Sequence, residues 1–317
     1  MSRTKELTVV AIGGHSLLDP GLPSTVENQF AVTAAALAPI ADLLERGERL
    51  VLTHGNGPQV GFMALRSELA KNRVHEVPLD SLVADSQGSL GYMIQRALRE
   101  ELQGRGVSTG VAAVVTEVRV DSNDQAFREP TKPIGRFYSS EEAEALSAEH
   151  GWKMIEDANR GYRRVVPSPI PQQIVQLDVI KSLIDSGVTV ICCGGGGIPV
   201  TGDPGEHIEG HEAVIDKDRT SMLLAIELGA DRLVISTGVD RVYRDFLTDH
   251  AEPLATISMA EAIRLDEDGQ FPSGSMGPKI EAAIHYLQRV DGEVVICSPE
   301  NLVAAMNGDA GTRIRRD

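Results

Sequence analysis

The fold is decided by a pattern that the chain repeats three times: TVVAIGG at residues 8–14, RLVLTHGNG at 49–57 and VTVICCGGGG at 188–197. Each copy runs from a short apolar strand directly into a glycine turn. Glycine has no Cβ, so main-chain N–H groups in such a turn can approach an anion closely, above all where a helix N-terminus follows. The pair Gly13 and Gly14 also suits an ordinary tight turn. The four glycines at 194–197 instead indicate a loop that leaves room for a bound group.

The segments between the glycine turns alternate in a β–α–β order. Amphipathic stretches of helical length cover residues 25–45, 58–71 and 212–228, and short apolar runs such as 110–115 and 232–236 separate them. This order predicts an α/β protein, a three-layer αβα sandwich with a central, mainly parallel sheet and helices on both faces. Ligands of such sheets bind at the carboxyl ends of the strands, where the glycine turns fall.

One region breaks this alternation, at residues 121–164, where long apolar runs are few. It is either a plain surface insertion or a lid, and we favour the lid because Lys132, Arg163 and Arg164 are cations that can reach a phosphate. We therefore expect a single domain over residues 1–317 with an inserted, protruding lid subdomain at about 121–164.

Composition and charge exclude several classes of protein. The chain has 317 residues, 42% of them apolar, and a formal net charge of −16, which opposes binding to nucleic acid or acidic membranes. The opening MSRTKE leads into an apolar run too short for a secretory signal or a membrane span, so we expect a cytoplasmic protein. Cys192, Cys193 and Cys297 are expected to be reduced, buried thiols rather than a metal cage.

The densest group of candidate catalytic residues is EAVIDKDRTSMLLA at 212–225. Asp216 or Asp218 alone is explained equally well as an N-cap. Lys217 is harder to explain, because a cation near a helix N-terminus opposes the helix dipole. Lys279 follows GQFPSGSMGPK at another expected helix start. Two such lysines and three glycine turns supply the positioning and the positive charge that phosphoryl transfer requires.

The motifs of other phosphate-binding enzymes and of hydrolases are missing from the sequence. It has no GxxxxGK[ST] loop, no HRD or DFG segment of a protein kinase, no GxSxG elbow and no HExxH pair. GGGGIP lacks the GxGxxG spacing of a dinucleotide site. A nucleoside can instead lie against STGVDRVYRDF at 236–246, where Tyr243 is able to stack on a base, although packing on the rim of the sheet is the commoner fate of a tyrosine.

Seven strings resemble the motifs of the carbamate kinases, which belong to the amino-acid kinase superfamily. In the order of that family they are THGNGPQVG at 53–61, DSQGSLGYMIQRAL at 85–98, FREPTKPIGRFY at 127–138, RRVVPSPIP at 163–171, CGGGGIPV at 193–200, EAVIDKDRTSMLLA at 212–225 and GSMGPKIEAAI at 274–284. The resemblance extends from the first strand to AGTRI at 310–314, and therefore covers nearly the whole chain.

The resemblance implies reversible phosphoryl transfer between carbamoyl phosphate plus ADP and carbamate plus ATP. It also implies Mg²⁺ carried by the nucleotide without a protein metal site, a homodimer, and a place in arginine metabolism. Carried over by position, Lys217 and Lys279 would bridge the moving phosphoryl group, Asp218 would orient the two lysines, and Lys132 would close from the lid. A kinase of another small carboxylate or carbamate and a noncatalytic nucleotide sensor are the alternatives.

The resemblance also assigns binding residues at the two ends of the site. The carbamoyl end would be held by Gly13, Gly14, Gly55, Asn56 and Gly57. The nucleotide would be held by Gly194, Gly195, Gly196, Gly197, Thr237, Gly238, Val239, Asp240, Tyr243, Met276 and Pro278.

One position departs from the family pattern. The family usually reads GGN after its first strand, whereas this chain reads GGHS and places His15 where an amide is expected. An imidazole carries its donor and acceptor on different atoms and titrates near neutral pH. His15 is therefore expected at the substrate end, where it keeps the donor role, changes the acceptor that the enzyme uses, or weakens the enzyme.

Overall fold

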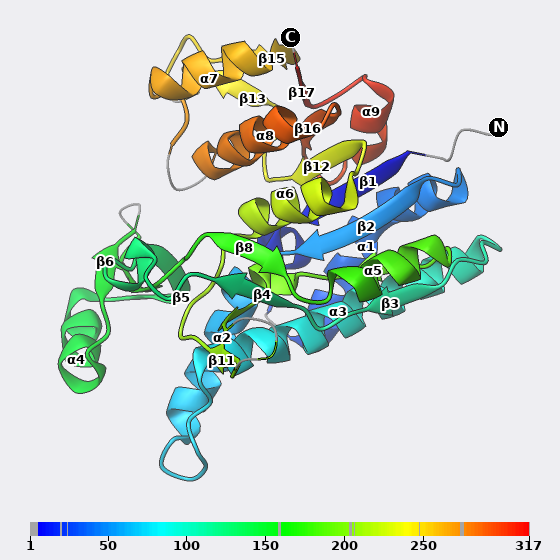
Figure 1. The fold of residues 1–317 in the computed structure, drawn as a ribbon. Helices are drawn as coiled ribbons and strands as arrows, with labels where there is room; N and C mark the ends of the chain where they lie inside the picture. Colours follow the sequence, from blue (N-terminus) through cyan, green and yellow to red (C-terminus); the bar gives the residue numbers. More distant parts are fainter. Residues whose placement is uncertain are drawn as a thin grey trace.

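The computed structural model describes residues 6–19, 21–23, 25–157, 160–202, 205, 207–246, 248–272 and 276–316, and all side chains in these ranges except that of His15. Figure 1 shows a central sheet with helices above and below it, and a smaller unit that protrudes at one end. The predicted α/β sandwich is confirmed, because a mainly parallel sheet lies between two layers of helices.

The main sheet has eight strands, and their neighbours explain how the glycine turns meet. β1, β2 and β9, which lead into these turns, are adjacent and parallel, and β12 lies parallel on the other side of β1. β17 runs antiparallel to β16, whereas the other neighbours are parallel. The order is β15 (Thr256–Ser258), β17 (Thr312–Arg315), β16 (Glu293–Cys297), β12 (Arg232–Ser236), β1 (Leu7–Ile12), β2 (Arg49–His54), β9 (Thr189–Ile191) and β3 (Val111–Ala113).

Each face of the sheet packs against its own helices, since successive residues of a strand point to opposite faces. Val9 belongs to the core on the face of α5 (Leu177–Asp185), α6 (Lys217–Leu228), α7 (Met259–Glu267) and α8 (Gly277–Arg289). Val10 belongs to the core on the face of α1 (Val26–Glu45), α3 (Leu79–Gly104) and α9 (Leu302–Asn307). Both valines are fully buried, and full burial of such a side chain contributes roughly 1.5–3 kcal/mol.

A second sheet and a two-stranded pair extend the carboxyl edge of the main sheet. The second sheet has the order β11 (Glu209–Gly210), β10 (Ile198–Thr201), β4 (Glu117–Val120) and β8 (Pro171–Ile174). β13 (Val242–Arg244) pairs with β14 (Glu252–Leu254). Three short 3-10 helices occur at Gly14–Leu17 (η1), Gln125–Phe127 (η2) and Gly194–Gly196 (η3).

The protruding unit, which we call the small sheet unit, contains β5 (Lys132–Tyr138), β7 (Tyr162–Val166), β6 (Met154–Glu156) and α4 (Ser140–His150). It lies against α2 (Gly57–Ala70), where a Cβ added to Gly61 would come within 2.2 Å of the Cα atom of Gly135. The Lys71 ammonium joins Glu68 of α2, at 2.7 Å, to Glu149 of α4, at 3.0 Å. This separate sheet starts inside the predicted range of residues 121–164 and ends two residues beyond it, at Val166 of β7. Both its role as a lid and the division of the chain into domains stay predictions.

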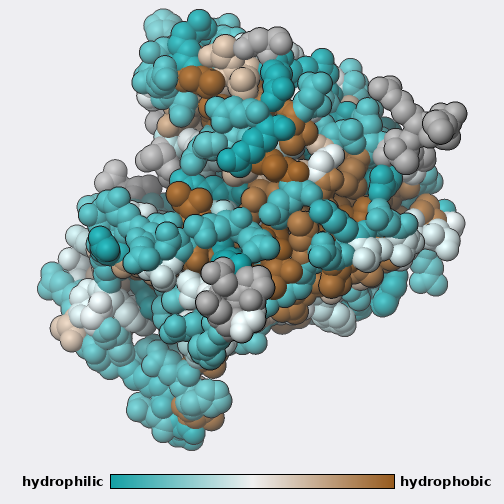
Figure 2. Space-filling view, viewed as in Figure 1, coloured by the Kyte–Doolittle hydropathy of each residue, from teal (hydrophilic) through white to brown (hydrophobic). Residues whose placement is uncertain are grey.

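The distribution of apolar residues and the burial of the cysteines are those of a globular protein. In Figure 2 apolar residues gather over the middle of the visible face, around α5 and α6, while the small sheet unit is mostly hydrophilic. Within the described ranges, no helix combines the length and the apolar character needed to cross a membrane. Cys192, Cys193 and Cys297 are free and buried, as predicted.

Candidate active site

The first two glycine turns touch each other at the carboxyl edge of the main sheet. A Cβ on Gly55 would lie 2.9 Å from the backbone nitrogen of Gly14, and a Cβ on Gly14 would lie 3.0 Å from the carbonyl carbon of Gly55. The first distance is shorter than a real Cβ atom allows, so Gly55 requires glycine, and the second leaves a Cβ on Gly14 in a very tight contact. The turns after β1 and β2 therefore form one continuous main-chain surface at the predicted edge.

The third glycine turn differs from its prediction. A Cβ on Gly194 would lie 2.4 Å from Nε2 of His54, one on Gly195 2.2 Å from Nδ2 of Asn56, and one on Gly196 2.4 Å from the carbonyl oxygen of Ile215. The prediction that this loop leaves side-chain room for a ligand is wrong, because all four glycines at 194–197 are buried against protein atoms. They lie beside the Asn56 turn rather than in the pocket of Tyr243, so the geometry gives no support to their assignment to the nucleotide.

Two residues of the string DSQG, at 85–88, hold the second and third turns in place. Nδ2 of Asn56 donates to the Ser86 hydroxyl at 2.8 Å. The Gln87 side chain accepts from the backbone of Thr116 at 2.7 Å and donates to the carbonyl of Gly194 at 3.0 Å. In the sequence this string stands out only as part of a family resemblance. Its helical position, with both side chains facing the core, was the signal for such a supporting role.

The imidazole of His54, the last residue of β2, is neutral. Burial lowers its pKa to about 4, and the nearby Lys217 acts in the same direction, although a hydrogen bond with the Gly55 carbonyl acts against both. His54 therefore fills space beside Gly194 without adding a charge to the site at neutral pH.

The two predicted catalytic lysines share one carboxylate. Lys217 is the first residue of α6, and Lys279 lies in the first turn of α8. Their Nζ atoms lie 2.9 Å and 3.0 Å from the two carboxylate oxygens of Asp218, whose side chain is 5% exposed. Lys217 Nζ also donates to the Ala11 carbonyl at 3.3 Å. The structure thus brings Lys217, Lys279 and Asp218 together, as the sequence predicted.

These buried charged groups shift one another's pKa values. Burial acts to raise the pKa of Asp218, but the two lysines outweigh it, so the pKa is lowered and the carboxylate is charged. Burial lowers the pKa of Lys217, and the charge of Lys279 adds to this effect, while Asp218 opposes it. The cluster carries a surplus of positive charge, as an anion-binding site requires.

Lys132 reaches this cluster from the small sheet unit through Asp216. The Asp216 side chain caps α6 by accepting from the backbone of Asp218 at 2.9 Å, and it forms a 2.6 Å ion pair with the Lys132 ammonium. Burial acts to raise the pKa of Asp216, but Lys132 outweighs it and the pKa is lowered. Asp216 is therefore both the N-cap that the sequence allowed and the contact that ties Lys132 to α6.

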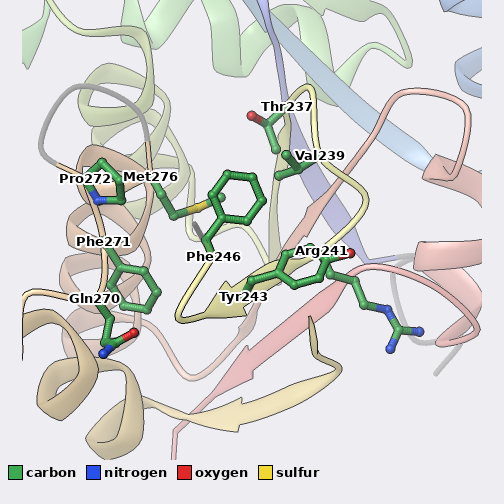
Figure 3. A pocket seen from close by; sticks show the side chains of 9 residues that line it. All are labelled: Thr237, Val239, Arg241, Tyr243, Phe246, Gln270, Phe271, Pro272 and Met276. Carbon is green, nitrogen blue, oxygen red and sulfur yellow. The ribbon is translucent and has the colours of Figure 1, made fainter. Parts of the chain in front are cut away.

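Two cavities adjoin these residues. One, of about 280 Å³, is lined by Gly13, Ser16, Lys217, Ser236, Thr237, Gly238 and Lys279. The other, of about 360 Å³, is lined by Thr237, Val239, Arg241, Tyr243, Phe246, Gln270, Phe271, Pro272 and Met276. Thr237 lines both cavities. Figure 3 shows Phe246 and Met276 pointing toward each other across the second cavity, with the Arg241 guanidinium extending away from it.

Only some of the residues predicted to bind the nucleotide line the same cavity. Thr237, Val239, Tyr243 and Met276 line the second cavity and Gly238 the first. Asp240 accepts a hydrogen bond from the Tyr243 hydroxyl at 3.0 Å. Pro278 lies in the first turn of α8. Phe246 and Phe271 also line the second cavity but were not predicted from the sequence, although YRDF and QFP lie close to the predicted residues.

Two residues predicted at the substrate end remain to be placed. Gly57 begins α2, and the side chain of His15 lies outside the described atoms.

Comparisons with known proteins agree with this geometry. Residues 6–298 match the model of the amino acid kinase family. Carbamate kinase 2 of Enterococcus faecalis is 44% identical over 310 residues, which cover 97% of this chain and 98% of the relative. The carbamate kinase of Clostridium perfringens is 45% identical over 314 residues, with coverage of 96% and 98%. The structure of a carbamate kinase from Giardia lamblia bound to AMP-PNP superposes with a TM-score of 0.91 at 40% identity, covering 100% of both chains.

Proposed function

The chain belongs to the amino acid kinase family, and from this premise we propose that it is a carbamate kinase. It transfers a phosphoryl group between carbamoyl phosphate plus ADP and carbamate plus ATP, in either direction. The relatives that it resembles over nearly their full length bear this name. The similar carbamate kinase of Giardia lamblia was solved with AMP-PNP, an ATP analogue, which supports ATP and ADP as the nucleotides.

The observation that carries the proposal is the shared carboxylate of Asp218 beside the smaller cavity. It keeps two lysine ammonium groups at neighbouring positions, both of which line that cavity together with Gly13. A phosphoryl group in transfer gains charge on its equatorial oxygens, and fixed cations with glycine main-chain groups stabilise that charge. Lys132 adds a third cation from the small sheet unit, held beside the lysine cluster by its ion pair with Asp216.

The reaction proceeds by direct, in-line transfer from one substrate to the other. The residues that line the smaller cavity supply positive charge and hydrogen-bond donors, so positioning and electrostatic stabilisation account for the chemistry without a covalent enzyme intermediate. The adjoining larger cavity, with Phe246, Phe271 and Met276, suits the apolar faces of a nucleoside base. Thr237 lines both cavities, which supports a nucleotide whose phosphates extend from the larger into the smaller.

Magnesium fits this arrangement as a companion of the nucleotide. Both carboxylates near the lysines are already paired, Asp216 with Lys132 and Asp218 with Lys217 and Lys279. Mg²⁺ commonly keeps its waters and binds to substrate phosphates. We therefore assign it to the phosphates of ATP or ADP, where it neutralises part of their charge.

The assembly and the cellular setting follow from the resemblance alone. We propose a homodimer in the cytoplasm with a role in arginine metabolism. The free, buried cysteines are consistent with a reducing compartment.

The test is ATP formation from carbamoyl phosphate, ADP and Mg²⁺ by the purified protein. Lys217→Ala serves as the blank, which also corrects for the spontaneous decomposition of carbamoyl phosphate. ATP formation that is lost in the variant supports the proposal. No ATP formation by a protein that still binds ATP contradicts it and points to another acceptor, for which the GGHS turn at 13–16 is the place to look.

A further inference from the structure

Two buried glutamines lie beside the glycine turns, and they differ in their partners. Gln59 and Gln87 are each 4% exposed. Gln87 uses both ends of its amide, accepting from the Thr116 backbone and donating to the carbonyls of Thr116 and Gly194. Gln59 donates from Nε2 to the Gly14 carbonyl at 3.4 Å. Its Oε1 atom is buried and has no hydrogen-bond partner within the part of the chain that the structure describes.

The orientation of the Gln59 amide is fixed by Gly14. A carbonyl oxygen accepts hydrogen bonds and cannot donate them, so the end of the amide that faces the Gly14 carbonyl must be the NH₂ group. Turning the amide over would bring two acceptors together. Among the described residues Oε1 is therefore an acceptor without a donor, and a buried acceptor in this state is costly unless a bound molecule supplies the donor.

The location of Gln59 associates it with the substrate rather than with the core. It lies in the first turn of α2, directly after the Gly55, Asn56 and Gly57 turn. Its contact with Gly14 places its amide next to the turn whose Gly13 lines the cavity of the two lysines. This is the end of the site that we assigned to the carbamoyl group.

The chemistry of the carbamoyl group calls for such an acceptor. Its carboxyl and phosphoryl oxygens accept hydrogen bonds, and the lysines and glycine turns supply donors for them. Its amino group carries two N–H donors, for which lysine ammonium groups and backbone N–H groups offer nothing. The Oε1 atom of Gln59 is the matching acceptor.

We propose that Gln59 is a specificity-determining residue whose Oε1 accepts a hydrogen bond from the amino group of carbamate or carbamoyl phosphate, while its Nε2 holds the Gly14 turn. This inference rests on the proposed function and deepens it. Acetyl phosphate, which carries a methyl group where carbamoyl phosphate carries the amino group, would leave Oε1 unpaired. A site built to pair with a polar group rejects an analogue that lacks it.

The experiment compares kcat/KM for carbamoyl phosphate with kcat/KM for acetyl phosphate, both with ADP and Mg²⁺, in the wild-type protein and in Gln59→Met. Methionine has a similar length and no amide acceptor. The expected result is a fall of about tenfold or more in the ratio of the two values, because carbamoyl phosphate loses its hydrogen bond and acetyl phosphate loses none. A merely structural role would lower both values together and leave the ratio unchanged.

Gln87→Met is the matched control, since it changes a glutamine of equal burial whose partners are all protein groups. It should lower the midpoint of thermal unfolding and keep the ratio. Gln59→Leu is measured in parallel, so that poor folding of one variant does not decide the outcome. An unchanged ratio in a folded Gln59 variant overturns the inference while leaving the proposed function intact. Absence of wild-type activity toward carbamoyl phosphate contradicts the proposed function itself.

Discussion

Two clusters of charge lie at opposite edges of the main sheet, and both hold a buried carboxylate among several cations. At the carboxyl edge Asp218 pairs with Lys217 and Lys279. At the amino edge Glu293, 10% exposed, pairs with Arg232 at 2.5 Å, with Arg313 at 2.6 Å and with Arg315 at 2.8 Å. Strand register produces the second cluster, because Glu293 lies opposite Arg232 on β12 and opposite Arg315 on β17.

The clusters differ in what surrounds the cations. Arg313 also donates to the carbonyls of Ala305 and Met306, at 2.5 Å and 3.0 Å, and Arg232 extends to Glu6 at 3.4 Å. Protein groups thus occupy the donors of these arginines. The lysine cluster instead borders a cavity of about 280 Å³ that Gly13 and Gly238 also line. A surplus of positive charge is therefore not enough to make an anion site, which also needs open space and glycine main chain beside the cations.

The largest difference between the two clusters is expected when a cation is removed from the lysine cluster. Lys217→Ala should lower kcat by about 10²–10³-fold, as expected for loss of one preorganised donor to transition-state charge. The measurement is steady-state ATP formation from carbamoyl phosphate and ADP. Arg315→Ala is the control from the other cluster and should keep kcat near the wild-type value. A near-normal kcat in Lys217→Ala would contradict the role of that lysine.

Removing the carboxylate at the amino edge should change stability and leave catalysis alone. Glu293→Gln leaves three guanidinium groups without their shared anion, and breaking a buried pair on one side costs about 3 kcal/mol. We expect the free energy of unfolding in urea to fall by this order, with kcat unchanged in the folded variant. Equal stability of variant and wild type would mean that the cluster contributes little.

A smaller effect is expected where the glycine loop packs against the site. Gly195 has a φ of +67°, and a Cβ there would lie 2.2 Å from Nδ2 of Asn56. Gly195→Ala should lower the free energy of unfolding by about 1–3 kcal/mol through backbone strain, and it should raise KM for carbamoyl phosphate by displacing Asn56. Gly187→Ala is a useful control, because its φ is similar at +81° and a Cβ there would contact nothing within 4 Å. Equal KM values in the two variants would argue against the role of Asn56.

The mildest test uses pH. Burial acts to raise the pKa of Glu293, but its three arginines outweigh it and lower the pKa from 4.5 to about 2. A carboxylate with a lowered pKa stabilises the fold fully above its unfolded pKa and loses this contribution as the pH falls toward the folded value. Between pH 5 and pH 3 the unfolding free energy of the wild type should therefore fall more steeply than that of Glu293→Gln. Parallel curves would show that Glu293 is not the group responsible.

The sequence predicted those parts of the molecule that depend on local pattern. Apolar runs that end in glycine gave the strands and their edge. Lys217 was singled out because a cation at a helix start opposes the helix dipole, and Lys279 because it lies at a second expected helix start. Parallel strands bring such local features together at one edge, so the fold and the lysine cluster followed.

Features that depend on contacts between residues far apart in the sequence could not be predicted from it. Whether a glycine faces a ligand or a neighbour such as His54 is decided by the fold, and the four glycines at 194–197 were misjudged for this reason. Phe271 and Phe246 line one cavity from separate segments. The Glu293 cluster requires the pairing of β16 with β17, which the β–α–β pattern does not contain.

The contact between Gly61 and Gly135 joins the small sheet unit to α2 backbone against backbone. Neither glycine has a side chain at this contact, whereas the preceding residues Val60 and Ile134 belong to one buried apolar cluster. An alanine at position 61 would act as a wedge of one methyl group between the two elements. In such a variant α2 and the small sheet unit would be held apart. Compounds that bind only when these two elements are separated could be selected against it.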